Sequence, residues 1–280
     1  MKVFQYKLSE VKFNDFSLFG YSAAGEETAI IVPELDATFD IGKCPREALT
    51  VNHVLLTHGH IDHAAGLPYY FAQHYFQSKK IGTALVPQEI VEPLEQIMDL
   101  WQKIDGDIHP RNIIGMKPGD QFEINKRLLV RAFATNHNVP SLGYSIIEVR
   151  HKLSQKFYGK CNEDLLKLKS DGIQLTTTEE TPLIAYLGDT ALADFSTLPH
   201  VANAKVLVLE CTFFAEDHFD RSRAYKHTHV KDLPIFLKNM NNEHIIISHV
   251  TKRIKVQDAK KILADTLDAN TLQKIRFLME

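Results

Sequence analysis

The sequence predicts an α/β fold, and two observations support this prediction. Short runs of Val, Ile and Leu are typical of buried strands, and longer segments with apolar residues three or four positions apart are typical of helices. The two kinds of segment alternate along the chain, as they do in α/β proteins. The chain has 280 residues, of which 44% are hydrophobic and 24% charged, enough to bury a large core. We therefore expect one domain over 1–280.

Eight apolar runs are expected to form strands. In chain order they are TAIIVPEL (28–35), HVLLT (53–57), TALVP (83–87), RLLVRAFA (127–134), GYSIIEVR (143–150), TPLIAYLG (181–188), KVLVLEC (205–211) and EHIIIS (243–248). Four segments are expected to be helical: one that follows Asp62, one from 87 to 103, one that begins near His229 and one that begins near Val256. No repeat, low-complexity tract or Gly/Pro/Ser-rich linker divides the sequence.

Composition narrows the classes of partner and compartment. The formal net charge of -3 provides no overall attraction to nucleic acid or to an anionic membrane, so a polyanion would have to meet a local basic patch. The three cysteines (44, 161 and 211) are far apart and lack a CxxC spacing, which argues against a disulfide framework. We expect a cytoplasmic protein. The sequence shows neither a signal peptide nor a bilayer-spanning stretch, so we expect neither secretion nor membrane insertion.

The segment 150–181 differs from its surroundings because it loses the apolar periodicity. Up to Asp171 it holds six Lys or Arg (150, 152, 156, 160, 167 and 169) against three acids (163, 164 and 171). The segment is either a solvated surface insertion or a substrate-binding arm. The residues by themselves leave both interpretations open.

The stretch HGHIDH, directly after VLLT, predicts a metal site. His58 and His60 are two positions apart on an extended loop, so their rings project to the same side and can share one ion. Asp62 and His63 point away from that pair and can hold a second ion. Two ions about 3.5–4 Å apart stabilise both the attacking and the leaving oxygen of a displacement. Imidazole and carboxylate ligands favour zinc, with manganese and iron as alternatives.

Four further polar residues follow the ends of expected strands: His137, Asp189, Glu210 and His249. Open sheets place their chemistry just beyond the strand ends, so these side chains are expected to meet HGHIDH. Each one alone would fit a loop residue or a structural histidine. Together they complete two coordination shells.

These motifs resemble the metallo-β-lactamase superfamily, whose HxHxDH signature is present as His58, His60, Asp62 and His63. Within it the chain resembles the ribonuclease Z family, which cleaves at the 3′ end of tRNA, and most of all its short plant-type branch. The resemblance runs over 22–254 through AGEETAIIVPELDATFDIGKCPREA, THGHIDHAAGLPYY, NHNVPSLGY, GDT, ECTF, HTH and SHVTKR.

The resemblance implies a four-layer αββα sandwich with the metal site at one edge of the sheets. It implies one zinc held by His58, His60 and His137, and a second held by Asp62, His63 and His249. Asp189 would bridge the two. The nucleophile is then a metal-activated water that attacks a phosphodiester.

The resemblance also implies catalytic groups beside the metals. His227 of KHTHVK matches the family's proton donor to the leaving oxygen, and Glu210 of ECTF would orient it. Asp62 would accept a proton from the attacking water in addition to binding metal. His229 is assigned no role.

Substrate contacts are expected from Arg253 and Thr251, although the final motif HVTKRI departs from the family's H-[FIL]-S-x-R-Y. Thr251 replaces the serine and Ile254 the tyrosine. With the resemblance, the insertion is expected to be a short arm whose basic residues grip tRNA phosphates, chiefly Lys152, Lys156 and Lys160. A homodimer is expected on the same grounds.

The resemblance therefore predicts a zinc-dependent endoribonuclease that removes the 3′ trailer of precursor tRNA. The alternative is a small-molecule hydrolase on the same two metals, most of all a phosphodiesterase, otherwise a lactonase, thioesterase or arylsulfatase. A catalytically silent RNA-binding module would lack metal ligands, and no ligand is missing from the motifs.

Overall fold

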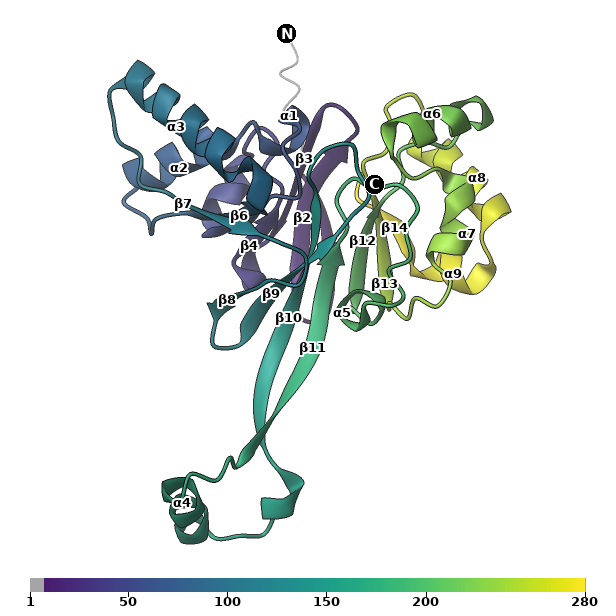
Figure 1. Cartoon of the computed structure of the whole chain (residues 1–280). Coiled ribbons are helices and arrows are strands. Elements are labelled where there is room, and N and C mark those ends of the chain that lie inside the picture. The colour runs from purple at the N-terminus through teal and green to yellow at the C-terminus, as the bar shows by residue number, and fades with distance from the viewer. Residues whose placement is uncertain (1–7, 280) are drawn as a thin grey trace.

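A computed structural model describes residues 8–279 and places their strands in two sheets of seven (Figure 1). The first sheet holds, in order, β1 (Ser9–Lys12), β2 (Ser17–Ala23), β3 (Glu27–Val32), β4 (Ala37–Phe39), β5 (His53–Leu55), β6 (Thr83–Pro87) and β7 (Asn112–Met116). The second runs from β14 (Ile275–Phe277) through β13 (His244–Ser248), β12 (Val206–Glu210), β11 (Thr176–Tyr186), β10 (Leu142–Leu153) and β9 (Leu128–Ala134) to β8 (Gln121–Asn125).

Each sheet is antiparallel in one part and parallel in the other. Strands β1 to β4 and β8 to β11 pair antiparallel, and β4 to β7 and β11 to β14 pair parallel. Parallel neighbours need crossover connections, and helices occur in several of them. The helices are α1 (Ile61–Ala64), α2 (Leu67–Phe76), α3 (Val91–Asp105), α4 (Asn162–Ser170), α5 (Pro199–Ala202), α6 (Phe219–Tyr225), α7 (Leu233–Phe236), α8 (Val256–Thr266) and α9 (Ala269–Lys274). None of the helices within 8–279 is long and apolar enough to cross a bilayer.

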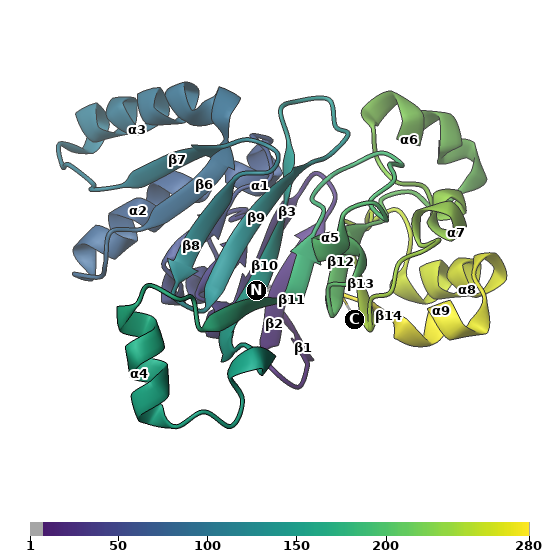
Figure 2. The same cartoon turned by 60° about the horizontal axis from the view of Figure 1, so that its bottom comes forward.

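The two sheets pack face to face with helices outside them (Figure 2). The inner core joins buried side chains of both sheets, among them Val32, Phe39, Leu55, Tyr144, Ile184 and Val208. A second cluster packs α2 on the first sheet, and a third packs α7 and α8 on the second. The expected αββα sandwich is confirmed.

All eight expected strands are present, but several boundaries differ. In TAIIVPEL the strand β3 ends at Val32, because Pro33 begins a short 3-10 helix over Pro33–Leu35. The helix expected from 87 becomes α-helical only at Val91, after another 3-10 turn. The helix expected near His229 is a 3-10 turn followed by the four residues of α7.

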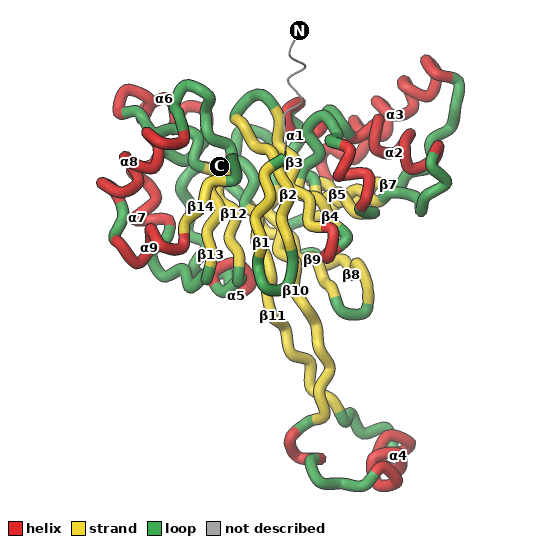
Figure 3. The backbone as a smooth tube through the Cα atoms, turned by 180° about the vertical axis from the view of Figure 1, so that it is seen from behind, coloured by secondary structure: helices red, strands yellow, loops and turns green. Residues whose placement is uncertain are grey.

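The polar segment forms an arm that projects from the body of the molecule (Figure 3). We call residues 150–178 the arm. Strands β10 and β11 continue well into it, where Lys152 pairs with Thr177 and Leu153 with Thr176, and α4 lies at the tip. The apolar pattern could not predict these strand extensions, because both faces of the hairpin are exposed and the cross-strand ladder alone maintains them.

Candidate metal centre

The stretch HGHIDH lies where the two sheets meet. It follows β5 of the first sheet, and His58 forms an isolated bridge with Ser141, just before β10 of the second. Helix α1 begins at Ile61, so the chain turns between His60 and Asp62. Asp62 Oδ2 accepts a hydrogen bond from the Gly25 backbone N–H at 2.9 Å, which fixes this carboxylate.

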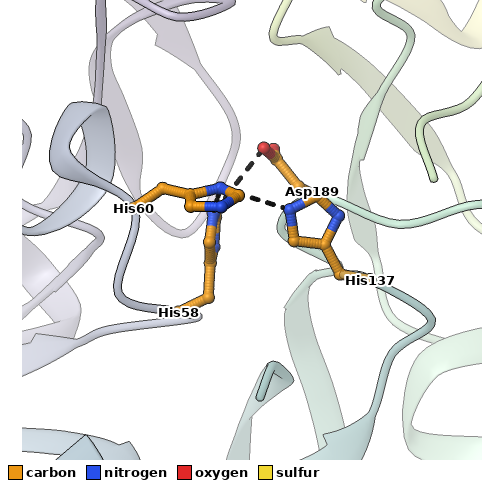
Figure 4. Close-up of side chains that lie close together, drawn as sticks. All are labelled: His58, His60, His137 and Asp189. Carbon is orange, nitrogen blue, oxygen red and sulfur yellow. Dashed lines mark hydrogen bonds and ion pairs between the residues drawn. The ribbon is translucent and has the colours of Figure 1, made fainter. Parts of the chain in front are cut away.

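Four side chains form a first group of metal-ligand type: His58, His60, His137 and Asp189 (Figure 4). One donor atom from each lies within 4.8 Å of those of the others. His58 Nε2 is 3.0 Å from His60 Nδ1, which is 3.3 Å from His137 Nε2. The expected ligands of one ion are therefore close together.

A second group contains Asp62, His63 and His249. The two imidazole Nε2 atoms are 3.4 Å apart, and Asp62 Oδ2 lies 3.8 and 3.7 Å from them. Asp189 Oδ2 lies between the groups, 3.4 Å from His63 Nε2, 3.3 Å from His249 Nε2 and 3.8 Å from His58 Nε2. The structure thus brings the predicted bridging carboxylate into contact with both groups.

The outward-facing ring nitrogens are held by other polar groups. His58 Nδ1 is 2.9 Å from Thr57 Oγ1, His63 Nδ1 is 2.7 Å from Asp40 Oδ2, and His249 Nδ1 is 2.9 Å from Thr212 Oγ1. Such partners orient metal-binding imidazoles and leave the opposite nitrogen free for an ion. Buried Asp189 Oδ1 also has no hydrogen-bond partner among the described residues. The donor set therefore fits bound metal ions.

Burial and mutual charge shift the pKa values of these histidines. Burial lowers the pKa of His58 well below its usual value, and nearby His63 adds to the effect. Burial likewise lowers the pKa of His60 and of His137. For His63, burial is outweighed by the Asp189 and Asp40 carboxylates, so its pKa is raised. Three of the imidazoles are thus held neutral, the form that binds metal.

The two carboxylates remain ionised. Burial by itself would raise the pKa of Asp62, but the nearby His249 and His63 imidazoles outweigh it and bring that pKa to about 2. The same two histidines overcome burial at Asp189 and hold its pKa well below the usual value. Both acids can therefore bind cations at neutral pH.

Glu210 and His227 form a pair beside the metal-ligand groups. Glu210 ends β12, and its Oε1 is 2.9 Å from His227 Nδ1. The His227 ring stacks on His249, with centroids 5.2 Å apart and planes 18° apart. Burial would lower the pKa of His227, but Glu210 outweighs burial and raises it to about 9. His229, in contrast, caps the following turn with Asp232, so its role is structural.

Sequence reasoning missed two residues that orient the site. Asp40 follows β4 within FDIG, and besides His63 it accepts hydrogen bonds from Thr57 and from the Tyr186 hydroxyl. Thr212 lies within ECTF and links Glu210 Oε2 (2.7 Å) to His249. Both motifs were noted in the sequence, but the contacts join segments that are distant along the chain.

An open cavity of about 330 Å³ leads to the metal-ligand groups. Its walls include the expected substrate residues Thr251 and Arg253, together with three residues that sequence reasoning missed: Phe213, Arg221 and Tyr225. The lysines of the arm do not line it. Lys152 instead pairs with Glu179 at 2.5 Å, and Lys156 lies over the Phe157 ring. The structure therefore separates the predicted substrate contacts into two regions.

Comparison with known proteins defines the class. The sequence matches the Beta-lactamase superfamily domain over residues 35–250, and the chain belongs to that superfamily. A structure of the metallo-β-lactamase fold protein YhfI from Bacillus subtilis matches 98% of this chain and 90% of its own, with a TM-score of 0.61 and 14% identity. At that identity the match shows the fold alone.

Within the superfamily the chain belongs to the tRNase Z family. It is 32% identical to the Arabidopsis thaliana protein named tRNase Z TRZ1, over 90% of this chain and 91% of that one. It is 31% identical to the Arabidopsis protein named tRNase Z TRZ2, chloroplastic, over 90% of this chain and 72% of the relative. The crystal structure of the short form of human tRNase Z covers 97% of this chain and 95% of its own, with a TM-score of 0.57 and 14% identity.

Proposed function

We propose that this chain is a metal-dependent endoribonuclease that removes the 3′ trailer of precursor tRNA. One observation carries the proposal: Asp189 lies 3.3–3.8 Å from histidines of two ligand groups, and the Glu210–His227 pair lies directly beside them. Membership of the tRNase Z family supports RNA as the substrate.

The metal ligands proposed from the sequence remain the same. His58, His60 and His137 would hold one ion, Asp62, His63 and His249 the other, and Asp189 both. We propose zinc for both sites, with manganese and iron as alternatives. When bound, two such ions would lower the pKa of a water molecule and withdraw charge from the scissile phosphate.

Two acids and one histidine of the chain would handle protons. His227, which Glu210 keeps protonated at neutral pH, would donate to the leaving oxygen. Glu210 also accepts hydrogen bonds from the backbone of Thr190 and Thr228, so it is rigid. Asp62, held by Gly25, faces the cavity and would accept a proton from the attacking water.

Substrate binding is proposed at two places. Arg253 and Thr251 line the cavity and would contact the strand near the cut. The arm would contact tRNA phosphates through Lys152, Lys156 and Lys160. At Lys152 the phosphate would compete with Glu179 for the ammonium group.

We further propose a single-domain, cytoplasmic homodimer. Free cysteines support the location. Large apolar side chains on α2 and α3 are exposed and would suit a second copy, namely Tyr69, Phe76, Ile97, Leu100, Trp101 and Ile104. Light scattering measures the oligomeric state, and a monomer mass at micromolar concentration contradicts the dimer.

The experiment that tests the activity is cleavage of labelled precursor tRNA by zinc-loaded protein, beside His63→Ala. We expect a single cut after the discriminator base, lost in the variant. Replacing Lys152, Lys156 and Lys160 together by alanine should weaken tRNA cleavage and leave turnover of a small bis-aryl phosphodiester intact. Intact tRNA with rapid diester turnover contradicts the proposal and supports a small-molecule phosphodiesterase.

A further inference from the structure

The cavity extends from the metal-ligand groups to helix α6. Asp62, Asp189 and His249 line its inner part, and Arg221 and Tyr225 of α6 line another part of its wall. The two α6 residues are four positions apart, so their side chains lie on the same face of the helix. Helix α6 therefore presents a cation and an aromatic ring next to the proposed reaction centre.

The side chains of this wall are stacked on each other. The Arg221 guanidinium carbon lies 5.6 Å from the Tyr225 ring centroid and 6.0 Å from that of Phe213. The buried Phe213 ring meets His227 edge-on at 6.1 Å, so the stack reaches the proposed proton donor. Tyr225 forms the outer end and is 53% exposed. Its ring is available to a ligand in the cavity.

The charges around the cavity point to an anionic ligand. Two neighbouring cations are neutralised by partners in the protein: Arg223 binds Asp232 at 2.8 Å, and Lys252 pairs with Glu26. In contrast, Arg221 and Arg253 have no carboxylate partner within ion-pair distance anywhere in residues 8–279, although both line the cavity. Two guanidinium groups are thus left for phosphates.

We propose that Tyr225, Arg221 and Phe213 form a nucleobase subsite for the nucleotide next to the scissile phosphate, with Arg221 and Arg253 contacting its phosphates. The inference rests on the proposed function, because it assumes an RNA strand in this cavity. Every base has a π-face, so an aromatic ring beside a guanidinium holds unpaired nucleotides of any sequence. The subsite would position the strand without reading its sequence.

The test compares kcat/KM for precursor tRNA with that for a precursor that carries abasic nucleotides on both sides of the cut. On the normal precursor we expect Tyr225→Ala to lower kcat/KM about 5- to 150-fold, the range of one base-stacking contact. Tyr225→Phe keeps the ring and should restore most of that loss. On the abasic precursor, the gap between wild type and Tyr225→Ala should largely close.

Arg276→Ala serves as the control for Arg221→Ala, because Arg276 is exposed on β14 and lies outside the cavity. We expect only the Arg221 variant to lose cleavage. An equal loss for Tyr225→Ala on normal and abasic precursors overturns the subsite, since the ring would then act without a base. Thermal unfolding of each variant shows whether the fold is retained.

A binding measurement separates failure of the subsite from failure of the proposed function. Fluorescence anisotropy compares an eight-nucleotide single-stranded RNA with its abasic counterpart, for wild type and Tyr225→Ala. If wild type does not cut precursor tRNA but prefers the RNA with bases, and the variant loses this preference, the subsite stands and the proposed function fails. If wild type shows no preference, the subsite is overturned.

Discussion

Asp40 tests whether the orientation of His63 controls metal binding. Its carboxylate is fully buried; Oδ1 accepts from the Thr57 backbone N–H at 2.8 Å, and Oδ2 from His63 Nδ1 at 2.7 Å and the Tyr186 hydroxyl at 2.9 Å. Asp40→Asn keeps the shape but places an NH₂ group against at least one donor. This donor–donor clash is relieved most directly if the His63 proton moves from Nδ1 to Nε2. Nε2 is the nitrogen that faces the metal-ligand group.

The expected magnitude follows from these contacts. Loss of a partner that orients a metal-binding histidine costs about 10- to 100-fold in metal affinity, which is about 1.4–2.7 kcal/mol. Hydrogen bonds to a charged group contribute about 1.5–3 kcal/mol each, so the metal-free protein should also lose a few kcal/mol of unfolding free energy. The loss of metal affinity and the loss of stability are thus both expected from the single substitution Asp40→Asn.

The assay is competition for zinc against a chromophoric chelator, with urea unfolding of the chelated protein beside it. Asp36→Asn is the matched control, because Asp36 likewise accepts from a backbone N–H, that of Asn52 at 2.8 Å, and lies near a histidine, His53. Because His53 belongs to neither metal-ligand group, unlike His63, this variant should lose stability alone. Zinc affinity of Asp40→Asn within twofold of wild type would refute the reasoning.

Three further predictions concern the proton donor, a strained turn and acid stability. Glu210→Gln should lower the cleavage rate about 10²- to 10⁴-fold at unchanged metal content, since His227 loses its charged partner; an unchanged rate contradicts the pairing. Gly188→Ala should lower the free energy of unfolding in urea by about 1 kcal/mol or more, because φ is +61° and the new Cβ would lie 2.8 Å from the Thr57 side chain; an unshifted urea midpoint argues against this strain. Burial, with a contribution from Arg131, lowers the pKa of His200 to about 4, below the unfolded-state value of about 6.5. The unfolded state therefore takes up the proton first, and stability falls as pH drops from about 6.5 towards 4. His200→Gln should reduce that fall, and identical acid-unfolding curves would exclude the effect.

The fold was predictable wherever burial left a local pattern. Strand β12 is buried along its whole length and β13 in all but its first residue, so VLVLE and HIIIS stand out as apolar runs. Strand β8 alternates exposed and half-buried residues, and β14 has three residues, so neither produced a clear run. The strand extensions in the arm are polar and exist through cross-strand pairing.

The sequence pattern pointed to the seven proposed ligand residues together with Glu210, because each is part of HGHIDH or lies at or shortly after the end of an apolar strand, and strand ends on one side of a sheet converge. The resemblance to the family then separated the ligands from Glu210. Only the tertiary structure revealed that Asp40 orients His63 or that Tyr186, 146 residues away, supports Asp40. It also decided that Glu179 partly neutralises Lys152. Local periodicity reports which faces are buried, whereas the partner of a polar group depends on which distant segments the fold brings together.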